Sequence, residues 1–394
     1  MTWRVALVTL GLALLAPASA AASNGFVERV NVLHEWHGEA GGYLGWAVSE
    51  LQDIDHDHAT DLIFGEPSTP DGGRTWVYSG RTGKLIYRLP GALGDDQGYA
   101  IADAGDTNRD GIHDIISGAP SQTGMGPGRA YLYSGRSGRL LHTFTGVAAG
   151  DELGSAVAGA GDQNHDGYDD VLVGAEGANA AYVFSGRNYK LLRRYDGAPG
   201  AGLGSGADLA GRHRLIVGAL NEGGTGGAHV FSGARERFSL APPLGASRFG
   251  QFFVAGVGRV DGDFVPDFYV GDYNAQNGNG FAGVYSGLDG SLIHGWAGGP
   301  LDGTGPGREA GDVNHDGRID LAVGSYTASD GAPSAGRVDV RSGRTGNVLR
   351  TITSTTEGEN LGFDVVGVGD VNRDGRLDLL ISAAEGDTVY LVAG

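Results

Sequence analysis

Short loops of acidic residues recur along the chain, and their spacing suits a hard cation. Aspartate or asparagine occupies positions one, three, five and nine of each loop, usually with glycine at position six. Side chains at positions one, three and five of a tight loop converge, a main-chain carbonyl at seven adds an oxygen, and the acid at nine completes the shell. Calcium takes roughly six to eight oxygen ligands, whereas Mg²⁺ needs a tighter octahedron. The loops therefore predict calcium.

Five of these loops carry all four side chains, and we expect each to bind one calcium ion. A metal-free turn would explain a single loop, but five copies in register favour metal. In the first loop His58 replaces the glycine. The predicted ligands are Asp53, Asp55, Asp57 and Asp61; Asp106, Asn108, Asp110 and Asp114; Asp162, Asn164, Asp166 and Asp170; Asp312, Asn314, Asp316 and Asp320; and Asp370, Asn372, Asp374 and Asp378.

Two further units depart from this pattern. In the fifth unit Arg259 stands at position one, which leaves a degenerate metal loop of Asp261, Asp263 and Asp267. The guanidinium could stand in for the cation there, so a sixth calcium ion stays open. The fourth unit has lost the acids, and residues 210–213 take their place.

A second marker shows that the loops belong to seven repeats. A short apolar strand ends in Ser-Gly, or finally Ala-Gly, at intervals of 47 to 56 residues, and glycine is abundant throughout, at 74 positions. Repeats of this length with four short strands are typical of propeller blades. The marker glycines are Gly80, Gly135, Gly186, Gly233, Gly287, Gly343 and Gly394.

Each unit reads as four strands, which predicts an all-β fold, a seven-bladed β-propeller. In the first unit we expect strands over residues 44–51, 61–65, 74–79 and 84–89. The seventh unit stops after its third strand, and an N-terminal strand within about residues 26–36 would complete it and close the ring. An open β-solenoid is the alternative, but it would need capping repeats that the sequence does not show.

The repeats resemble the FG-GAP repeats of the integrin α N-terminal propeller. Phe249-Gly250 and Leu361-Gly362 occupy the Phe-Gly position, the acidic loop follows, and Gly118-Ala119-Pro120 matches the closing Gly-Ala-Pro. The resemblance covers about residues 26 to 394. It implies a seven-bladed propeller, calcium at the loops, and adhesion or ligand binding. With no inserted adhesion domain, leg domain or membrane anchor in the sequence, we expect a free-standing bacterial propeller rather than an integrin subunit.

The N-terminus and the composition indicate an exported protein. Arg4, an apolar run over residues 5–16 and Ala18-Ser19-Ala20 are typical of a signal peptide over residues 1–20, which leaves a single propeller domain over residues 21–394. The protein would be secreted, periplasmic or at the cell surface, without membrane insertion. It has no cysteine and a formal charge of −19, which argues against nucleic acid as a partner.

The face opposite the acidic loops is the expected binding surface, because its loops vary in length. Tyr273, Asn274 and Tyr326 are the candidate ligand-binding residues, and the expected partner is an extracellular protein or a glycan. No catalytic residue is assigned. The alternative is a polysaccharide lyase, since some calcium-containing propellers have that activity, and Tyr273, Tyr326, Arg248 and His294 would then be the first candidates.

Overall fold

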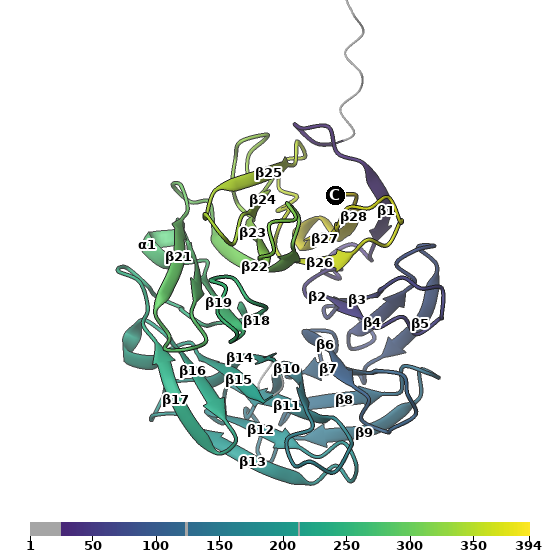
Figure 1. The fold of residues 1–394 in the computed structure, drawn as a ribbon. Helices are drawn as coiled ribbons and strands as arrows, with labels where there is room; N and C mark the ends of the chain where they lie inside the picture. Colours follow the sequence, from purple (N-terminus) through teal and green to yellow (C-terminus); the bar gives the residue numbers. More distant parts are fainter. Residues whose placement is uncertain (1–24, 123–124, 212) are drawn as a thin grey trace, which may run out of the picture.

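The computed structural model describes residues 25–122, 125–211 and 213–394, so the predicted signal peptide lies outside the described residues. The described chain forms seven four-stranded antiparallel sheets arranged in a ring (Figure 1). This confirms the seven-bladed propeller and excludes an open solenoid.

Each of blades 1 to 6 uses four consecutive strands, ordered from the centre of the ring to its rim. The first three blades are β2 (Val48–Leu51), β3 (Asp61–Glu66), β4 (Arg74–Tyr78) and β5 (Leu85–Pro90); β6 (Ala100–Gly105), β7 (Asp114–Ala119), β8 (Arg129–Tyr133) and β9 (Leu140–Thr145); and β10 (Leu153–Gly161), β11 (Asp170–Ala175), β12 (Ala180–Phe184) and β13 (Leu191–Asp196).

Blades 4 to 6 repeat this order, and helix is confined to three single turns in the described chain. The strands are β14 (Leu203–Ala210), β15 (Arg214–Ala219), β16 (Gly227–Ser232) and β17 (Arg235–Leu240); β18 (Val254–Val257), β19 (Asp267–Asp272), β20 (Phe281–Tyr285) and β21 (Leu292–Ala297); and β22 (Thr304–Gly311), β23 (Asp320–Ser325), β24 (Arg337–Arg341) and β25 (Val348–Thr353). The helical turns are η1 (Glu222–Gly224), α1 (Ala275–Gly278) and η2 (Ala384–Gly386). None of these is long and apolar enough to cross a membrane.

Blade 7 combines both ends of the described chain. Strands β26 (Val365–Gly369), β27 (Asp378–Ala383) and β28 (Thr388–Val392) are completed by β1 (Val32–His37), which pairs with β28 in antiparallel register. The predicted closure of the ring by an N-terminal strand is confirmed. Earlier residues reach the neighbouring blade, since Phe26 forms an isolated bridge with Ser354 beyond β25.

The second strand of each blade is an apolar run because neighbouring blades cover both of its faces. Every residue of β3 is buried, for example, and the blades meet at glycines. A Cβ on Gly65 in β3 would lie 1.9 Å from the main-chain oxygen of Gly98, which itself has a φ of +91°. The same close approach joins Gly118 to Gly154 at the next junction. Only glycine therefore fits at positions 65 and 118 of the second strands.

The inner strand begins later than the sequence predicted. β2 starts at Val48 rather than at residue 44, because Gly45 adopts a φ of +86° and its N–H donates to the main-chain oxygen of Gly65. The acidic loops then leave the inner strands on one side of the ring, called here the loop face. The loops between blades, and those between second and third strands, form the opposite side, called here the linker face.

Candidate metal centres and the channel mouth

The position-nine aspartate anchors every acidic loop. In all six loops this residue is completely buried, and one carboxylate oxygen accepts the N–H of position two, as Asp61 does from Ile54 at 2.8 Å. The other oxygen accepts the N–H of the Ser-Gly marker glycine, as Asp114 does from Gly135 at 3.2 Å. The two sequence markers of the repeat are thus joined by a hydrogen bond. The six residues are Asp61, Asp114, Asp170, Asp267, Asp320 and Asp378.

The position-one aspartate shapes the turn of each complete loop. In the second loop, Asp106 accepts the N–H groups of Asp110 and Gly111, both at 2.9 Å. Gly111 has a φ of +85°, which favours glycine, and His58 adopts a φ of +66° at the same place in the first loop. Each of these hydrogen bonds uses one lone pair of a carboxylate oxygen of Asp106. The second lone pair of each oxygen stays available to a cation in the loop.

The loop oxygens suit a hard cation such as calcium. In the first loop, carboxylate oxygens of Asp53, Asp55 and Asp61 lie within 4.8 Å of one another. In the third loop, the side-chain oxygen of Asn164 is buried and has no hydrogen-bond partner. A buried oxygen of this kind is expected to have a partner, and a cation would provide one.

Burial opposes ionisation of the position-nine acids. It raises the pKa of Asp61 to about 7 and the pKa values of Asp114 and Asp170 to about 6, and the nearby acids of each loop add to the rise. The pKa values of Asp267, Asp320 and Asp378 shift in the same direction for the same cause. A bound cation would favour the ionised form.

The degenerate fifth loop keeps its carboxylates together. Oxygens of Asp261, Asp263 and Asp267 lie within 4.8 Å of one another, as in the first loop. Arg259 is exposed and belongs to none of the ion pairs within the described part of the chain, so its guanidinium is not inserted among them. In the fourth blade, the hairpin between β14 and β15 closes directly, with Ala210 opposite Arg214.

An aromatic cluster surrounds the linker-face end of the central channel, called here the aromatic mouth. Its rings come from blades 1, 2, 5, 6 and 7, and they also meet across the channel end, since the ring of Phe252 in blade 5 lies 5.7 Å from that of Tyr99 in blade 2. The ring of Trp46, for instance, lies 5.6 Å from that of Tyr99 and 4.9 Å from that of Phe363. The members are Trp46, Tyr99, Phe252, Phe253, Tyr273, Tyr326 and Phe363.

Two of the three predicted ligand-binding residues belong to the aromatic mouth. The rings of Tyr273 and Tyr326 lie 6.2 Å apart, and the Tyr273 hydroxyl donates to Gln251. Asn274 is exposed beside them and donates from its side chain to Ser247. Their role in binding stays a prediction.

The four residues proposed for a lyase do not share one site. Arg248 lies near Tyr273, since both donate to the same oxygen of Gln251. His294 instead lies on the outermost strand β21, where its Nε2 donates to the main-chain oxygen of Gly343 in a Ser-Gly turn on the loop face.

Comparison with known proteins agrees with this geometry. No family model matches the chain. It is 32% identical over 171 residues to integrin alpha-3 of Cricetulus griseus, and 31% identical over 173 residues to integrin alpha-IIb of Mus musculus. Integrin alpha-PS5 of Drosophila melanogaster is 28% identical over 186 residues. The chain is therefore a seven-bladed propeller that is similar, over part of its length, to integrin α subunits.

The matches cover only part of each protein. They span 39%, 39% and 42% of this integrin-α-like propeller, in the order given, and 16%, 17% and 18% of the relatives. The chain thus spans under a fifth of the length of the curated relatives it matches. The glycines of the FG-GAP pattern have a clear place in the propeller, since they meet where consecutive blades come closest.

Proposed function

We propose that this integrin-α-like propeller is an extracellular calcium-binding module that binds a protein on its linker face. The integrin relatives support an adhesion or binding role. The observation that carries the proposal is the aromatic mouth, because aromatic residues are enriched at the energetically important centres of protein interfaces.

Apolar side chains around the aromatic mouth favour a protein partner over a glycan. The loops that connect successive blades expose Leu93, Val147, Leu244 and Leu301, and Val147 and Leu244 are 96% and 95% exposed. These side chains come from four separate linkers on the same face as the aromatic mouth, and exposed aliphatic side chains suit contact with a protein better than contact with a glycan. The residues Tyr273, Asn274 and Tyr326 would contact the partner at this centre.

Calcium bound on the loop face would stabilise the blades that carry the binding surface on their linker face. The five complete loops would each hold one ion, and the fifth-blade loop of Asp261, Asp263 and Asp267 is the candidate for a sixth. With no cysteine in the sequence, disulfides cannot stabilise the protein. Each ion would therefore fix one turn between the inner strand and the second strand of its blade.

The test is a binding screen on the mature chain in calcium. Immobilised extracellular-matrix proteins, together with acidic and neutral polysaccharides, serve as probes, and retention and new chain ends are measured in the same samples. We expect retention on a protein probe that falls at least about tenfold in Tyr273→Ala or Leu244→Ser. Phe264→Ser is the matched control, because Phe264 is equally exposed but lies on the loop face.

Three outcomes would contradict the proposal. Retention on polysaccharides alone would make the module a lectin, and new unsaturated chain ends would make it a lyase. An equal loss of retention in Phe264→Ser would place the binding surface elsewhere.

A further inference from the structure

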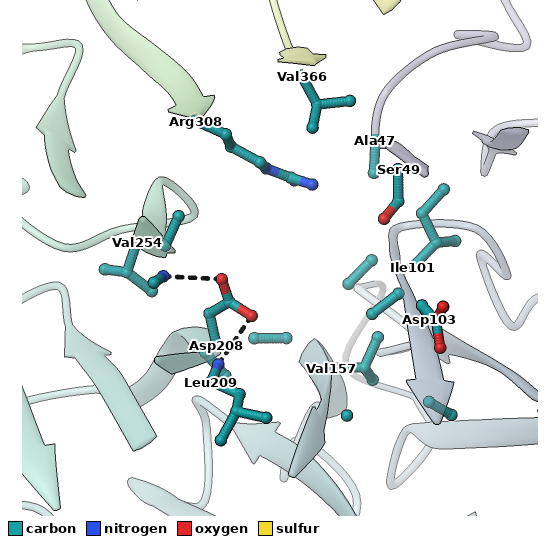
Figure 2. Close-up of a pocket in the computed structure, with 18 of the residues that line it drawn as sticks. Ala47, Ser49, Ile101, Asp103, Val157, Asp208, Leu209, Val254, Arg308 and Val366 are labelled. Atoms are coloured by element: carbon teal, nitrogen blue, oxygen red, sulfur yellow. Dashed lines mark hydrogen bonds between the residues drawn. The ribbon is translucent and has the colours of Figure 1, made fainter. Parts of the chain in front are cut away.

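A cavity of about 750 Å³ occupies the centre of the ring, between the aromatic mouth and the loop face. The inner strands of all seven blades line it, mostly with small apolar side chains such as Ala47, Ile101 and Val157 (Figure 2). Charged side chains among them therefore require an explanation, since burial of a charge without a partner is costly.

One cation and one anion of the cavity satisfy each other. Arg308 on β22 donates to Asp364 at 3.1 Å and to the main-chain oxygen of Val48 at 3.0 Å. Figure 2 shows its guanidinium pointing into the cavity, toward the wall that carries Ala47 and Ser49. Asp364 also accepts the N–H of Val48, so this pair has its partners within the protein.

Three further carboxylates, from three different blades, lack such a partner. Glu50 on β2, Asp208 on β14 and Glu309 on β22 line the same cavity. Asp208 accepts the N–H groups of Leu209 and Gly256, and Glu309 accepts that of Gly258. Within the described part of the chain, none of the three belongs to an ion pair.

Glu50 is the clearest sign of a missing partner. Its Oε2 atom is buried, yet it accepts no hydrogen bond from the described residues. Native proteins rarely leave a buried carboxylate oxygen unpaired, so a donor from outside the chain is expected at this point. Burial also raises the pKa of Glu50 to about 7 and that of Asp208 to about 6, although Arg308 opposes the rise.

We propose that this cavity binds a small organic cation carrying several N–H donors, with Glu50 and Asp208 as its acceptors and Glu309 adding negative charge. An anion is disfavoured because acids outnumber the single arginine. The cavity carboxylates lack the spacing of the acidic loops, and among the described residues they form no group of three carboxylate or imidazole ligand atoms within 4.8 Å of one another. An organic cation is therefore favoured over a metal ion. Glu50, Asp208 and Glu309 are not among the predicted calcium ligands, but Asp162 of the third loop also lines the cavity, so the test keeps calcium constant.

The test uses putrescine, a diamine, as the probe. Its binding to the full chain is measured by titration calorimetry with calcium held constant, and 1,4-butanediol serves as an uncharged probe of similar shape. We expect heat from putrescine alone, and a loss of affinity of at least about tenfold in both Glu50→Gln and Asp208→Asn. Glu357→Gln removes the same charge from an exposed loop and should bind as the wild type does.

The control measurements keep the result interpretable. Glu50→Gln removes a carboxylate whose ionisation is opposed by burial, so this variant should fold, and circular dichroism and metal content check that it does. The proposal is wrong if putrescine gives no more heat than 1,4-butanediol, or if both cavity variants bind putrescine as tightly as the wild type. A loss in Glu357→Gln equal to theirs would show that the affinity is only a response to overall charge.

Discussion

The ring of Trp36 lies 4.9 Å from the ring of Phe64 in an edge-on contact, although the two residues belong to different blades. Trp36 is on β1, the closing strand of blade 7, whereas Phe64 is on β3 of blade 1. The Trp36 indole N–H also donates to the main-chain oxygen of Gly83 in the first Ser-Gly turn. The closing strand is therefore fixed to the first blade as well as to its own.

Replacement of this tryptophan should weaken the ring at its closure. We expect Trp36→Ala to lower the free energy of unfolding by about 3 to 5 kcal/mol, because a buried aromatic side chain and its packing are lost. Urea unfolding in calcium measures the change. Trp76→Ala is the control, since Trp76 is only partly buried and lies on β4. If the two substitutions lower the free energy of unfolding equally, the contacts that close the ring are no more important for stability than other packing contacts.

Removal of position-five aspartates should remove calcium. Asp110→Ala combined with Asp166→Ala should lower the bound calcium by two ions per chain, as measured by elemental analysis. With a Kd near 10⁻⁴ M and calcium near 1 mM, each ion stabilises the fold by about 1.4 kcal/mol. The melting temperature in calcium should fall accordingly, and Glu357→Ala should change neither quantity. If a chelator leaves the melting temperature of the wild type unchanged, calcium has no stabilising role.

The fifth loop offers a gain-of-function test. Arg259→Asp restores the missing acid beside three carboxylates that are already close together. We expect this variant to bind one more calcium ion than the wild type if the native loop is empty, and the same number more tightly if it is occupied. Elemental analysis and calcium titration distinguish the two cases. If the variant gains no calcium ion and binds calcium no more tightly than the wild type, this loop is not a metal site.

The pH dependence of stability should report on Glu50. The pKa of this group is raised from 4.5 to about 7 in the fold, chiefly by burial, with Glu309 and Asp103 adding to the rise and Arg308 opposing it. A raised carboxyl pKa means that the folded state holds the proton more tightly than the unfolded chain does. The contribution of Glu50 to the free energy of unfolding is complete below the pKa of this group in the unfolded chain, and it is lost as the pH rises through about 7.

Glu50→Gln should therefore gain stability relative to the wild type as the pH rises. We expect the difference in unfolding free energy to grow by roughly 1 to 3 kcal/mol between about pH 5 and about pH 8, at constant calcium. Urea unfolding at each pH measures it, with Glu357→Gln as reference. A constant difference across this range would show that Glu50 is not perturbed in the fold.

Local sequence patterns predicted most of the fold. The seven marker glycines counted the blades correctly, and the acidic loops marked six of them, because the two markers are joined within a blade, as where Gly135 donates to Asp114. The start of β2 could not be placed by alternation. Leu44 and Val48 are both apolar and buried, but the left-handed conformation of Gly45 separates them.

The channel was harder to predict than the loops. Trp46, Tyr99 and Phe363 each follow the glycine of the Phe-Gly position, and this offset would have revealed part of the aromatic mouth. No sequence pattern of this kind marks the charged residues deeper in the channel. Glu50, Asp208 and Arg308 stand in strands whose residues are mostly buried on both sides, so the side that faces the channel is decided only when seven blades come together.

The shared seventh blade also has a consequence for biosynthesis. β1 leaves the ribosome before every other described strand, and its partner β28 emerges after all of them. Blades 1 to 6 are local in sequence and can form hairpins as they are made, but β1 must wait with its edge unpaired until translation reaches the last strand. During that interval, the nascent chain would be open to mispairing, and a chaperone that covers β1 would have its greatest effect then.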